Sequence, residues 1–370
     1  TNKDELTRKL LQEGGSFSEM ADGGINNVEL VAKLIGRGKT IVDGIERMQQ
    51  AVEGSICLVL MAREGIYAAR DRFGRFPLAI GKEVSPAGQG VSYAVATESS
   101  AFPNLGYELN RFLGPAEIVR LDHEGIHTER AAGEEKHVCA FLWIYTGDPS
   151  AVYEGISVEN AREQCGRAMA RGDRVDADFV AGVPDSGVGH AIGYAMESGL
   201  PYRRPLIKYT PGYGRSYTPP SKDIRDLVAT MKLCAIRDVI RGGRMVMCDD
   251  SIVRGTQLKN YTIRKLWDNG AKEIHIRPAC PPLMFPCKFS YSTRTTAELA
   301  SHRAIRALEG ETPGHIDEYL DHHSERYRRM VEWIRRDLNV TSLKYIHLQD
   351  MISAIGLPEE QLCLYCWRGR

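Results

Sequence analysis

The sequence predicts an α/β protein, α+β overall, in which an antiparallel β region precedes a doubly wound parallel sheet and a helical C-terminal tail. Short strand-like runs separated by turns between residues 56 and 121 are typical of antiparallel sheet. Strand-like and helix-like segments then alternate between residues 141 and 257, which is typical of a parallel sheet. A charged stretch with recurring apolar residues, 317–337, predicts one or two surface helices.

The composition excludes several classes of protein. The chain has 370 residues, enough for two domains with sizeable cores, and its formal net charge is zero. It shows no basic footprint for nucleic acid, no apolar run of membrane length and no signal-peptide pattern. Nine cysteines in a chain this long indicate a metal, a cluster or buried thiols, so we expect a cytoplasmic protein. Because the chain starts at Thr1 with a helix-like pattern, we expect a fragment that begins inside a domain.

The N-terminal region is expected to contain two helices and then a set of strands. An amphipathic pattern over residues 4–14 ends at two glycines, and a second helical pattern covers residues 27–37. Strand patterns follow at residues 56–62, 65–70, 77–81, 91–97 and 116–121.

The second region is expected to alternate strands and helices. A strand is predicted at residues 141–145, and Ser157 is expected to cap a helix that runs to residue 171. A second strand covers residues 178–183, a helix follows to residue 199, and a third strand covers residues 206–209. This alternation predicts a parallel sheet with helices on both faces.

The residues with the clearest chemistry follow a buried strand at 245–248. Asp249 and Asp250 stand at its carboxyl end, where open α/β sheets bind their ligands. The turn at 251–256 then opens a helix, and its backbone N–H groups can converge on a phosphate. Two acids beside an anion cradle suit a sugar phosphate, with the acids on ribose hydroxyls. The alternative is a plain strand–loop–helix junction with solvated acids.

This stretch resembles the phosphoribosyl pyrophosphate (PRPP) motif of type I phosphoribosyltransferases, in the form found in the glutamine PRPP amidotransferase family. The resemblance implies PRPP contacts from eight consecutive residues, Asp249, Asp250, Ser251, Ile252, Val253, Arg254, Gly255 and Thr256. A second polar turn after a strand resembles the family's pyrophosphate loop and adds Asp185, Ser186 and Gly187. The resemblance also implies Mg²⁺ bound at Ser186, Asp249 and Asp250.

A proline- and glycine-rich stretch at residues 208–220 predicts a long irregular loop. It resembles the family's flexible loop that closes over PRPP, which implies PRPP binding by Lys208 and catalytic roles for Arg215 and, just after the loop, Lys232. The alternative for any one of these cations is a solvated side chain.

Two segments of the N-terminal region, 69–78 and 96–100, resemble signatures of class II glutamine amidotransferase domains, which are N-terminal-nucleophile (Ntn) hydrolases. The terminal cysteine nucleophile of that class is absent from this sequence. Thr1 is a weak alternative nucleophile, because a helix pattern and not a strand follows it. The resemblance implies glutamine binding by Asp22, and an ordinary loop aspartate is the equal alternative.

Four cysteines resemble the cluster ligands of the iron–sulfur subgroup of the family: Cys139, Cys287, Cys363 and Cys366. Four thiolates satisfy a [4Fe–4S] cluster, and zinc on the same thiols is the alternative. The other five cysteines are interpreted as small buried hydrophobic residues.

The resemblance implies amidophosphoribosyltransferase activity, which forms 5-phosphoribosylamine and pyrophosphate from PRPP and ammonia in the first step of purine synthesis. The expected division is a partial glutaminase domain (1–137), a phosphoribosyltransferase domain (138–310) and a helical extension (311–370) that carries two cluster cysteines. The family implies a homodimer or homotetramer with feedback by purine nucleotides, and this chain should use free ammonia and not glutamine. The alternatives are a PRPP-sensing binding module without catalysis, or a phosphoribosyltransferase for a nucleobase.

Overall fold

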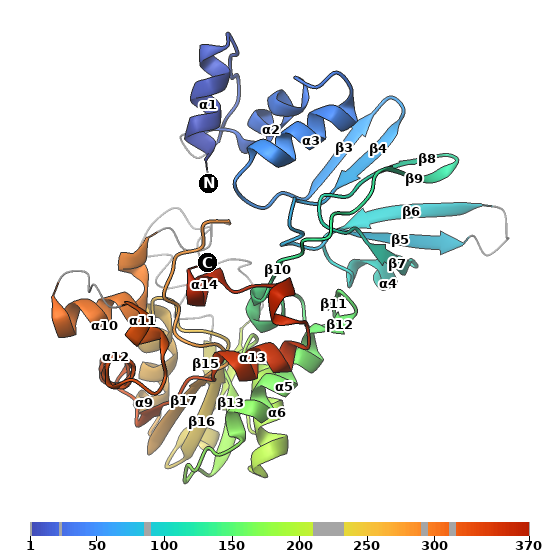
Figure 1. Ribbon diagram of the computed structural model, residues 1–370. Coiled ribbons are helices and arrows are strands. Elements are labelled where there is room, and N and C mark those ends of the chain that lie inside the picture. The colour runs from blue at the N-terminus through green and yellow to red at the C-terminus, as the bar shows by residue number, and fades with distance from the viewer. Residues whose placement is uncertain are drawn as a thin grey trace.

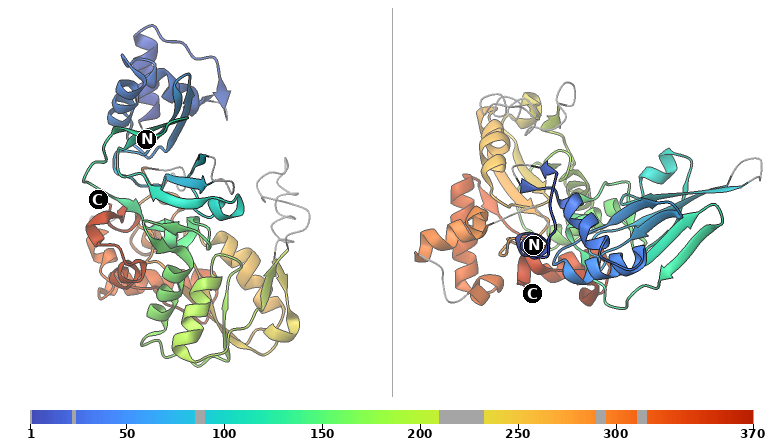
Figure 2. Two further views of the ribbon diagram at one scale, coloured as in Figure 1. Left: turned by 90° about the vertical axis from the view of Figure 1, so that its right-hand side faces the viewer. Right: turned by 90° about the horizontal axis from the view of Figure 1, so that it is seen from above.

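The computed structural model describes residues 2–21, 24–84, 90–209, 233–289, 295–310 and 316–369 (Figure 1). The chain forms an N-terminal part with antiparallel sheets and a second part built around a parallel sheet (Figures 1 and 2). Near the C-terminus, residues Tyr365–Arg368 lie between these two parts in Figure 1.

The N-terminal part confirms the predicted antiparallel sheets. One sheet has the order β3-β4-β8-β9, a second has the order β6-β5-β7, and β1 pairs with β2, with every pair antiparallel. Its strands are β1 (Met20–Ala21), β2 (Gly24–Ile25), β3 (Leu58–Ala62), β4 (Gly65–Ala69), β5 (Ala79–Val84), β6 (Val91–Ala96), β7 (Glu108–Phe112), β8 (Ile118–Asp122) and β9 (Gly125–Arg130). Its helices are α1 (Lys3–Gln12), α2 (Asn27–Ile35), α3 (Ile41–Ala51) and α4 (Ala101–Asn104).

Local chemistry explains where the N-terminal helices begin and end. Gly14 follows α1 with φ +82°, a conformation that suits glycine because it has no Cβ. The Asn26 side chain accepts a hydrogen bond from Val28 N at the start of α2, and the Thr40 side chain accepts one from Asp43 N in α3. Helix α3 was not predicted from the sequence, although the Thr40 cap is a usable signal.

The second part contains a parallel sheet with the order β13-β16-β17-β18. The strands of the whole second part are β10 (Val138–Cys139), β11 (Val152–Tyr153), β12 (Ile156–Ser157), β13 (Phe179–Gly182), β14 (Leu206–Lys208), β15 (Leu233–Ala235), β16 (Arg244–Asp249), β17 (Glu273–Pro278), β18 (Ser342–Leu343) and β19 (Leu362–Cys363). Its helices are η1 (Leu142–Thr146), α5 (Val158–Ala170), α6 (Val188–Ser198), α8 (Arg237–Ile240), η2 (Leu258–Ile263), α9 (Arg264–Asp268), η3 (Thr296–Glu298), α10 (Ala300–Glu309), α11 (Ile316–Leu320), α12 (Glu325–Leu338), α13 (Leu348–Ile355), η4 (Glu359–Gln361) and α14 (Tyr365–Arg368).

Both faces of the parallel sheet are covered, which explains why β13 and the middle of β16 are apolar. Along β16, Val246 and Cys248 pack in the core that α5, α6 and α13 complete. Met245 and Met247 point to the opposite face and pack in the core that α10 and α12 complete. The strand therefore holds its carboxyl end between two buried layers.

One predicted strand is absent, and another is present but belongs to a different sheet. Residues 141–145 lie in a π-helical turn, η1, where Trp143 is fully buried. A short apolar run does not distinguish a strand from a buried helical turn, and burial on all sides removed the periodic signal. Residues 206–209 contain β14, but β14 pairs antiparallel with β15 and lies outside the parallel sheet.

The helical C-terminal tail is confirmed, and it is joined closely to the second part. β18 extends the parallel sheet beside β17, while α12 packs on that sheet through Met330, Ile334 and Leu338. β19 pairs with β10 in a small parallel ladder. No helix in the described ranges is long and apolar enough to span a membrane.

Candidate functional site

Two buried acids stand at the carboxyl end of β16. Asp249 is the last residue of the strand and Asp250 follows it, and they are only 7% and 6% exposed. The backbone N–H of Asp250 donates to Asp249 Oδ1 at 3.0 Å, and the Ser251 hydroxyl donates to Asp250 Oδ1 at 2.6 Å. The strand and these bonds hold both carboxyl groups in one place, as predicted.

Burial makes these acids unfavourable as a charged pair. It raises the pKa of Asp249 well above the usual value, and the adjacent charge of Asp250 raises it further. Burial also raises the pKa of Asp250, although hydrogen bonds from Ser186 and Ser251 and the charge of Arg162 oppose the rise. A cation or a set of ligand hydroxyl groups would compensate two carboxylates removed from water.

The loop after β13 lies directly beside this pair, as the predicted adjacency requires. The backbone N–H of Val183 donates to Cys248 O at 2.9 Å, which joins the ends of the two strands. A Cβ added to Gly187 would lie 2.3 Å from Cys248 O, so only glycine allows this close approach. Lys208 Nζ lies 2.8 Å from Asp185 Oδ2 at the exposed rim. Ser186 and Gly187 therefore lie beside the two acids, while Asp185 and Lys208 pair with each other at the rim.

The rest of the predicted PRPP motif forms the turn into the next helix. Ile252 is buried and anchors the turn, and Gly255 adopts φ +72° where the chain turns into that helix. Val253 O accepts a hydrogen bond from Ala300 N at 2.8 Å, which fixes the turn to α10. Arg254 forms an ion pair with Glu298 at 2.6 Å, and Thr256 begins the helix.

One arginine under the site was not predicted from the sequence. Arg162 of α5 is 3% exposed and donates to the carbonyl oxygens of Trp143, Tyr145 and Gly147 at 2.8–3.0 Å. It thereby holds η1 against the strand end, and its charge favours ionised Asp250. The only signal for Arg162 was a charged residue among apolar helix positions. Such a residue usually has a solvated side chain, so the signal did not indicate burial.

Three predicted site residues lie outside the described residues: Asp22, Arg215 and Lys232.

The four predicted cluster cysteines come together from three segments. The β10–β19 ladder sets Cys139 opposite Cys363, and Met284 N and Phe285 N donate to Cys366 O at 2.9 and 3.1 Å. Burial raises the pKa of Cys139 to about 12, and the nearby thiols of Cys363 and Cys287 contribute. A hydrogen bond with Cys287 raises the pKa of Cys366. A bound metal would reverse this preference, because thiolates are the metal-binding form.

The surroundings fit a negatively charged group held by these four thiols. Burial raises the pKa of Cys363, while the backbone N–H of Tyr365 and the guanidinium of Arg75 oppose that rise. Arg75 Nε is buried without a hydrogen-bond partner among the described residues. Four thiol donors and a buried cationic donor are compatible with an iron–sulfur cluster or a zinc–thiolate site.

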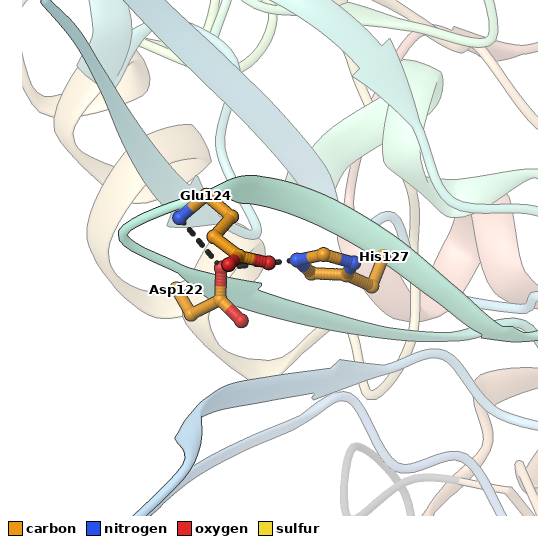
Figure 3. A group of neighbouring side chains, drawn as sticks. All are labelled: Asp122, Glu124 and His127. Carbon is orange, nitrogen blue, oxygen red and sulfur yellow. Dashed lines mark hydrogen bonds and ion pairs between the residues drawn. The ribbon is translucent and has the colours of Figure 1, made fainter.

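Three side chains that were not predicted as site residues lie together at the β8–β9 turn. Ligand atoms of Asp122, Glu124 and His127 lie within 4.8 Å of one another (Figure 3). Asp122 Oδ1 already accepts hydrogen bonds from Glu124 N at 2.8 Å and from His127 Nε2 at 3.0 Å. Asp122 is also paired with Arg120, so these contacts close the turn and do not indicate a metal site.

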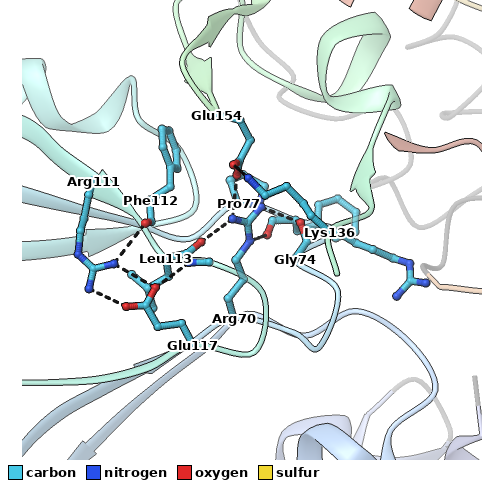
Figure 4. A network of polar contacts seen from close by, with 12 residues as sticks. Arg70, Gly74, Pro77, Arg111, Phe112, Leu113, Glu117, Lys136 and Glu154 are labelled. Atoms are coloured by element: carbon cyan, nitrogen blue, oxygen red, sulfur yellow. Dashed lines mark hydrogen bonds and ion pairs between the residues drawn. The ribbon is translucent and has the colours of Figure 1, made fainter. Parts of the chain in front are cut away.

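One signature residue of the N-terminal part has a structural role between the two parts. Arg70 is fully buried, donates to the carbonyl oxygens of Phe76 and Gly74 at 2.7 Å, and lies 2.8 Å from Glu154 of the second part (Figure 4). Lys136 approaches the other Glu154 oxygen at 2.6 Å. This network joins the β4 end to the β11–β12 turn.

The chain is similar to proteins of one activity. No family model matches it. It is 36% identical over 319 residues to the amidophosphoribosyltransferase of Mycobacterium tuberculosis, covering 86% of this chain and 55% of that protein. It is 33% identical over 371 residues to the amidophosphoribosyltransferase of Archaeoglobus fulgidus, covering 99% of this chain and 73% of that protein.

Solved structures agree with the sequence comparison. The glutamine PRPP amidotransferase of B. subtilis complexed with ADP and GMP matches with a TM-score of 0.80 and 30% identity, over 100% of this chain and 74% of that one. This similarity confirms the predicted fold class. The chain spans little more than half the length of its mycobacterial relatives.

Proposed function

Because the chain belongs to the amidophosphoribosyltransferase family, we propose that it transfers the phosphoribosyl group of PRPP to ammonia. The products are 5-phosphoribosylamine and pyrophosphate, in the first step of purine synthesis. The observation that supports this most strongly is the buried pair Asp249 and Asp250 beside the Ser186 loop at a strand end. That arrangement suits a sugar carrying hydroxyl groups next to its phosphates.

In this proposal each segment of the site holds one part of PRPP. Asp249 and Asp250 accept hydrogen bonds from the ribose hydroxyls, which removes the cost of burying both carboxylates. The backbone of the 251–256 turn binds the 5′-phosphate, and the 185–187 loop binds the pyrophosphate. Mg²⁺ bound at Ser186, Asp249 and Asp250 would neutralise pyrophosphate charge.

The chemistry is a displacement at the anomeric carbon of the ribose. The C–O bond to pyrophosphate breaks, the C–N bond to ammonia forms, and the new amine loses the extra proton to solvent. Positive charge develops on the ribose ring, and the adjacent carboxylates stabilise it. Lys208, Arg215 and Lys232 stabilise the charge of the departing pyrophosphate. Ammonia is itself the nucleophile, so the site needs no strong general base.

The remaining features of the proposal concern cofactors and partners. Cys139, Cys287, Cys363 and Cys366 hold a [4Fe–4S] cluster that fastens the C-terminal tail, with zinc as the alternative. If the protein has a glutaminase activity, Asp22 binds the glutamine. Purine nucleotides act as feedback inhibitors, in keeping with the B. subtilis structure complexed with ADP and GMP. The protein is a cytoplasmic homodimer or homotetramer.

The test is pyrophosphate release by anaerobically purified protein supplied with PRPP and Mg²⁺. Ammonium at high pH, glutamine and a nucleobase serve in turn as the acceptor. The expected result is release with ammonium and not with the nucleobase. The double variant Asp249→Asn/Asp250→Asn should lose this activity, while Asp350→Asn, which changes an exposed acid, should retain it.

The other outcomes select among the alternatives. Release with glutamine as well would reveal a nucleophile other than the expected terminal cysteine. Release with the nucleobase alone would replace the proposal with a nucleobase phosphoribosyltransferase. Binding of PRPP without release under any condition would indicate a sensing module.

A further inference from the structure

Arg75 lies where the N-terminal part meets the four-cysteine site. Its backbone N–H donates to the Asp71 carboxylate at 3.0 Å, which closes the turn after β4. Its carbonyl oxygen accepts a hydrogen bond from Cys139 N at 2.9 Å. The turn that carries Arg75 is therefore attached directly to one of the four cysteines.

The Arg75 side chain is buried against the same site. It is 8% exposed, and its guanidinium carbon lies 3.6 Å from the centroid of the Phe289 ring. The guanidinium interacts with the Cys363 thiol and favours its ionised form, while Nε has no hydrogen-bond partner in the described parts of the chain. Within those parts, no carboxylate forms an ion pair with Arg75.

A buried guanidinium without a carboxylate is costly unless another negative group lies beside it. Stacking on Phe289 supplies part of the compensation through a cation–π contact. The remaining candidate is the set of four sulfurs, whose ionised form carries negative charge when metal is bound. Hydrogen bonds to cluster sulfurs and local charge are the factors that set cluster potentials.

We propose that Arg75 is a positioning residue of the four-cysteine site, which donates a charged hydrogen bond to the Cys363 sulfur and fastens the N-terminal part to the bound metal group. This inference rests on the proposed metal occupancy of the four cysteines. Arg75, which is not a metal ligand, would then balance the negative charge of the four-cysteine site. The order of the 70–77 turn would depend on metal binding.

The first test compares reduction potentials of anaerobically purified full-length variants. Arg75→Gln keeps a donor of similar shape but removes the charge, so the reduced cluster loses stabilisation. We expect about a tenfold shift of the redox equilibrium, equivalent to a potential lower by about 59 mV for one electron. Arg75→Lys should lie between the two, and Arg72→Gln, an exposed arginine of the same turn, should match the wild type.

The second test needs no variant and therefore remains decisive if Arg75→Gln does not fold. Amide hydrogen exchange is measured in wild-type protein before and after the metal is removed with a chelator. Exchange in residues 70–77 should accelerate at least tenfold on removal, while exchange in the β16 strand should not change. Unchanged exchange in residues 70–77, or an Arg75→Gln potential equal to that of the wild type, overturns the inference.

Metal analysis separates this inference from the proposed transferase. If the protein holds zinc and not iron, the first test measures zinc retention in the presence of a chelator. Arg75→Gln should weaken that retention about tenfold. Wild-type protein that holds neither metal overturns the inference, whereas the transferase proposal is decided by pyrophosphate release. Arg75 is not among the residues assigned to PRPP, so the two results are independent.

Discussion

Gly187→Ala is the sharpest perturbation of the contact between the two strand ends. The added Cβ would lie 2.3 Å from Cys248 O and 2.8 Å from Val183 N. Ordinary van der Waals contact begins near 3.4 Å, so the loop must move by about 1.1 Å. Both obstructing atoms belong to the backbone at the ends of neighbouring strands, and neither can rotate away.

The movement has two measurable costs. Overpacking of this kind lowers the free energy of unfolding by about 1–3 kcal/mol. The displaced loop also carries Ser186 away from Asp250, and a misplacement of about 1 Å in an active site reduces activity about a hundredfold. We therefore expect a loss in PRPP-dependent pyrophosphate release larger than the loss in stability alone explains.

The measurements are urea unfolding and pyrophosphate release, with Gly199→Ala as the control. Gly199 lies at the other end of α6 with φ +74° and nothing within 4 Å of an added Cβ. That change should cost about 1 kcal/mol through backbone strain and leave activity unaltered. Wild-type stability and activity in Gly187→Ala would refute the close approach of the loop to β16.

Variants of three more residues, Asp250, Glu154 and Cys139, test the roles of their charges and thiols. Asp250→Asn should weaken PRPP binding about tenfold to a hundredfold in calorimetry, because each hydrogen bond to a charged group is worth about 1.5–3 kcal/mol. The free Asp250→Asn protein should be more stable than the wild type at pH 7, because burial raises the pKa of Asp250 and its charge destabilises the fold above that value. Burial alone would raise the pKa of Glu154, but Arg70 and Lys136 outweigh burial and lower it. Glu154→Gln should therefore cost about 3 kcal/mol at neutral pH in urea unfolding, and the difference from wild type should shrink below pH 4.5 as wild-type Glu154 protonates. Cys139→Ser should abolish iron binding in metal analysis without changing the oligomeric state, whereas Cys165→Ser, at a buried cysteine outside the set, should retain iron.

A sequence predicts the strand-end acids well because the signal is local. An apolar run followed by two acids and a glycine-containing turn places the acids at the end of a strand, provided that the strand is covered on both faces. The structure has β16 in that position, with Asp249 at its end and Gly255 in the turn. The cysteine set was predicted from resemblance, and the β10–β19 ladder brings Cys139 and Cys363 together across more than 200 positions of sequence.

The two wrong predictions of secondary structure and sheet membership concern segments whose structure depends on tertiary packing. The η1 segment is apolar because it is enclosed, and its sequence contains no periodicity to distinguish it from a strand. The sequence predicts β14 as a parallel strand because its antiparallel partner β15 lies more than 20 residues further along the chain, so no local pattern marks the pairing.

Arg75 and Arg162 were not identified because an arginine is usually solvated and only packing reveals its burial. Their partners lie on other elements, so no local pattern marks either residue. The domain division at residues 137 and 310 stays a prediction.

In the proposed function, the end of β16 and the loop after β13 form a PRPP site. The most direct measurement is calorimetric titration of PRPP with Mg²⁺ into wild-type protein and into Asp249→Asn/Asp250→Asn. The account predicts saturable binding to the wild type and at least a hundredfold weaker binding to a double variant that remains folded. Equal affinity for the two proteins would contradict the assignment of the strand-end acids to the ribose.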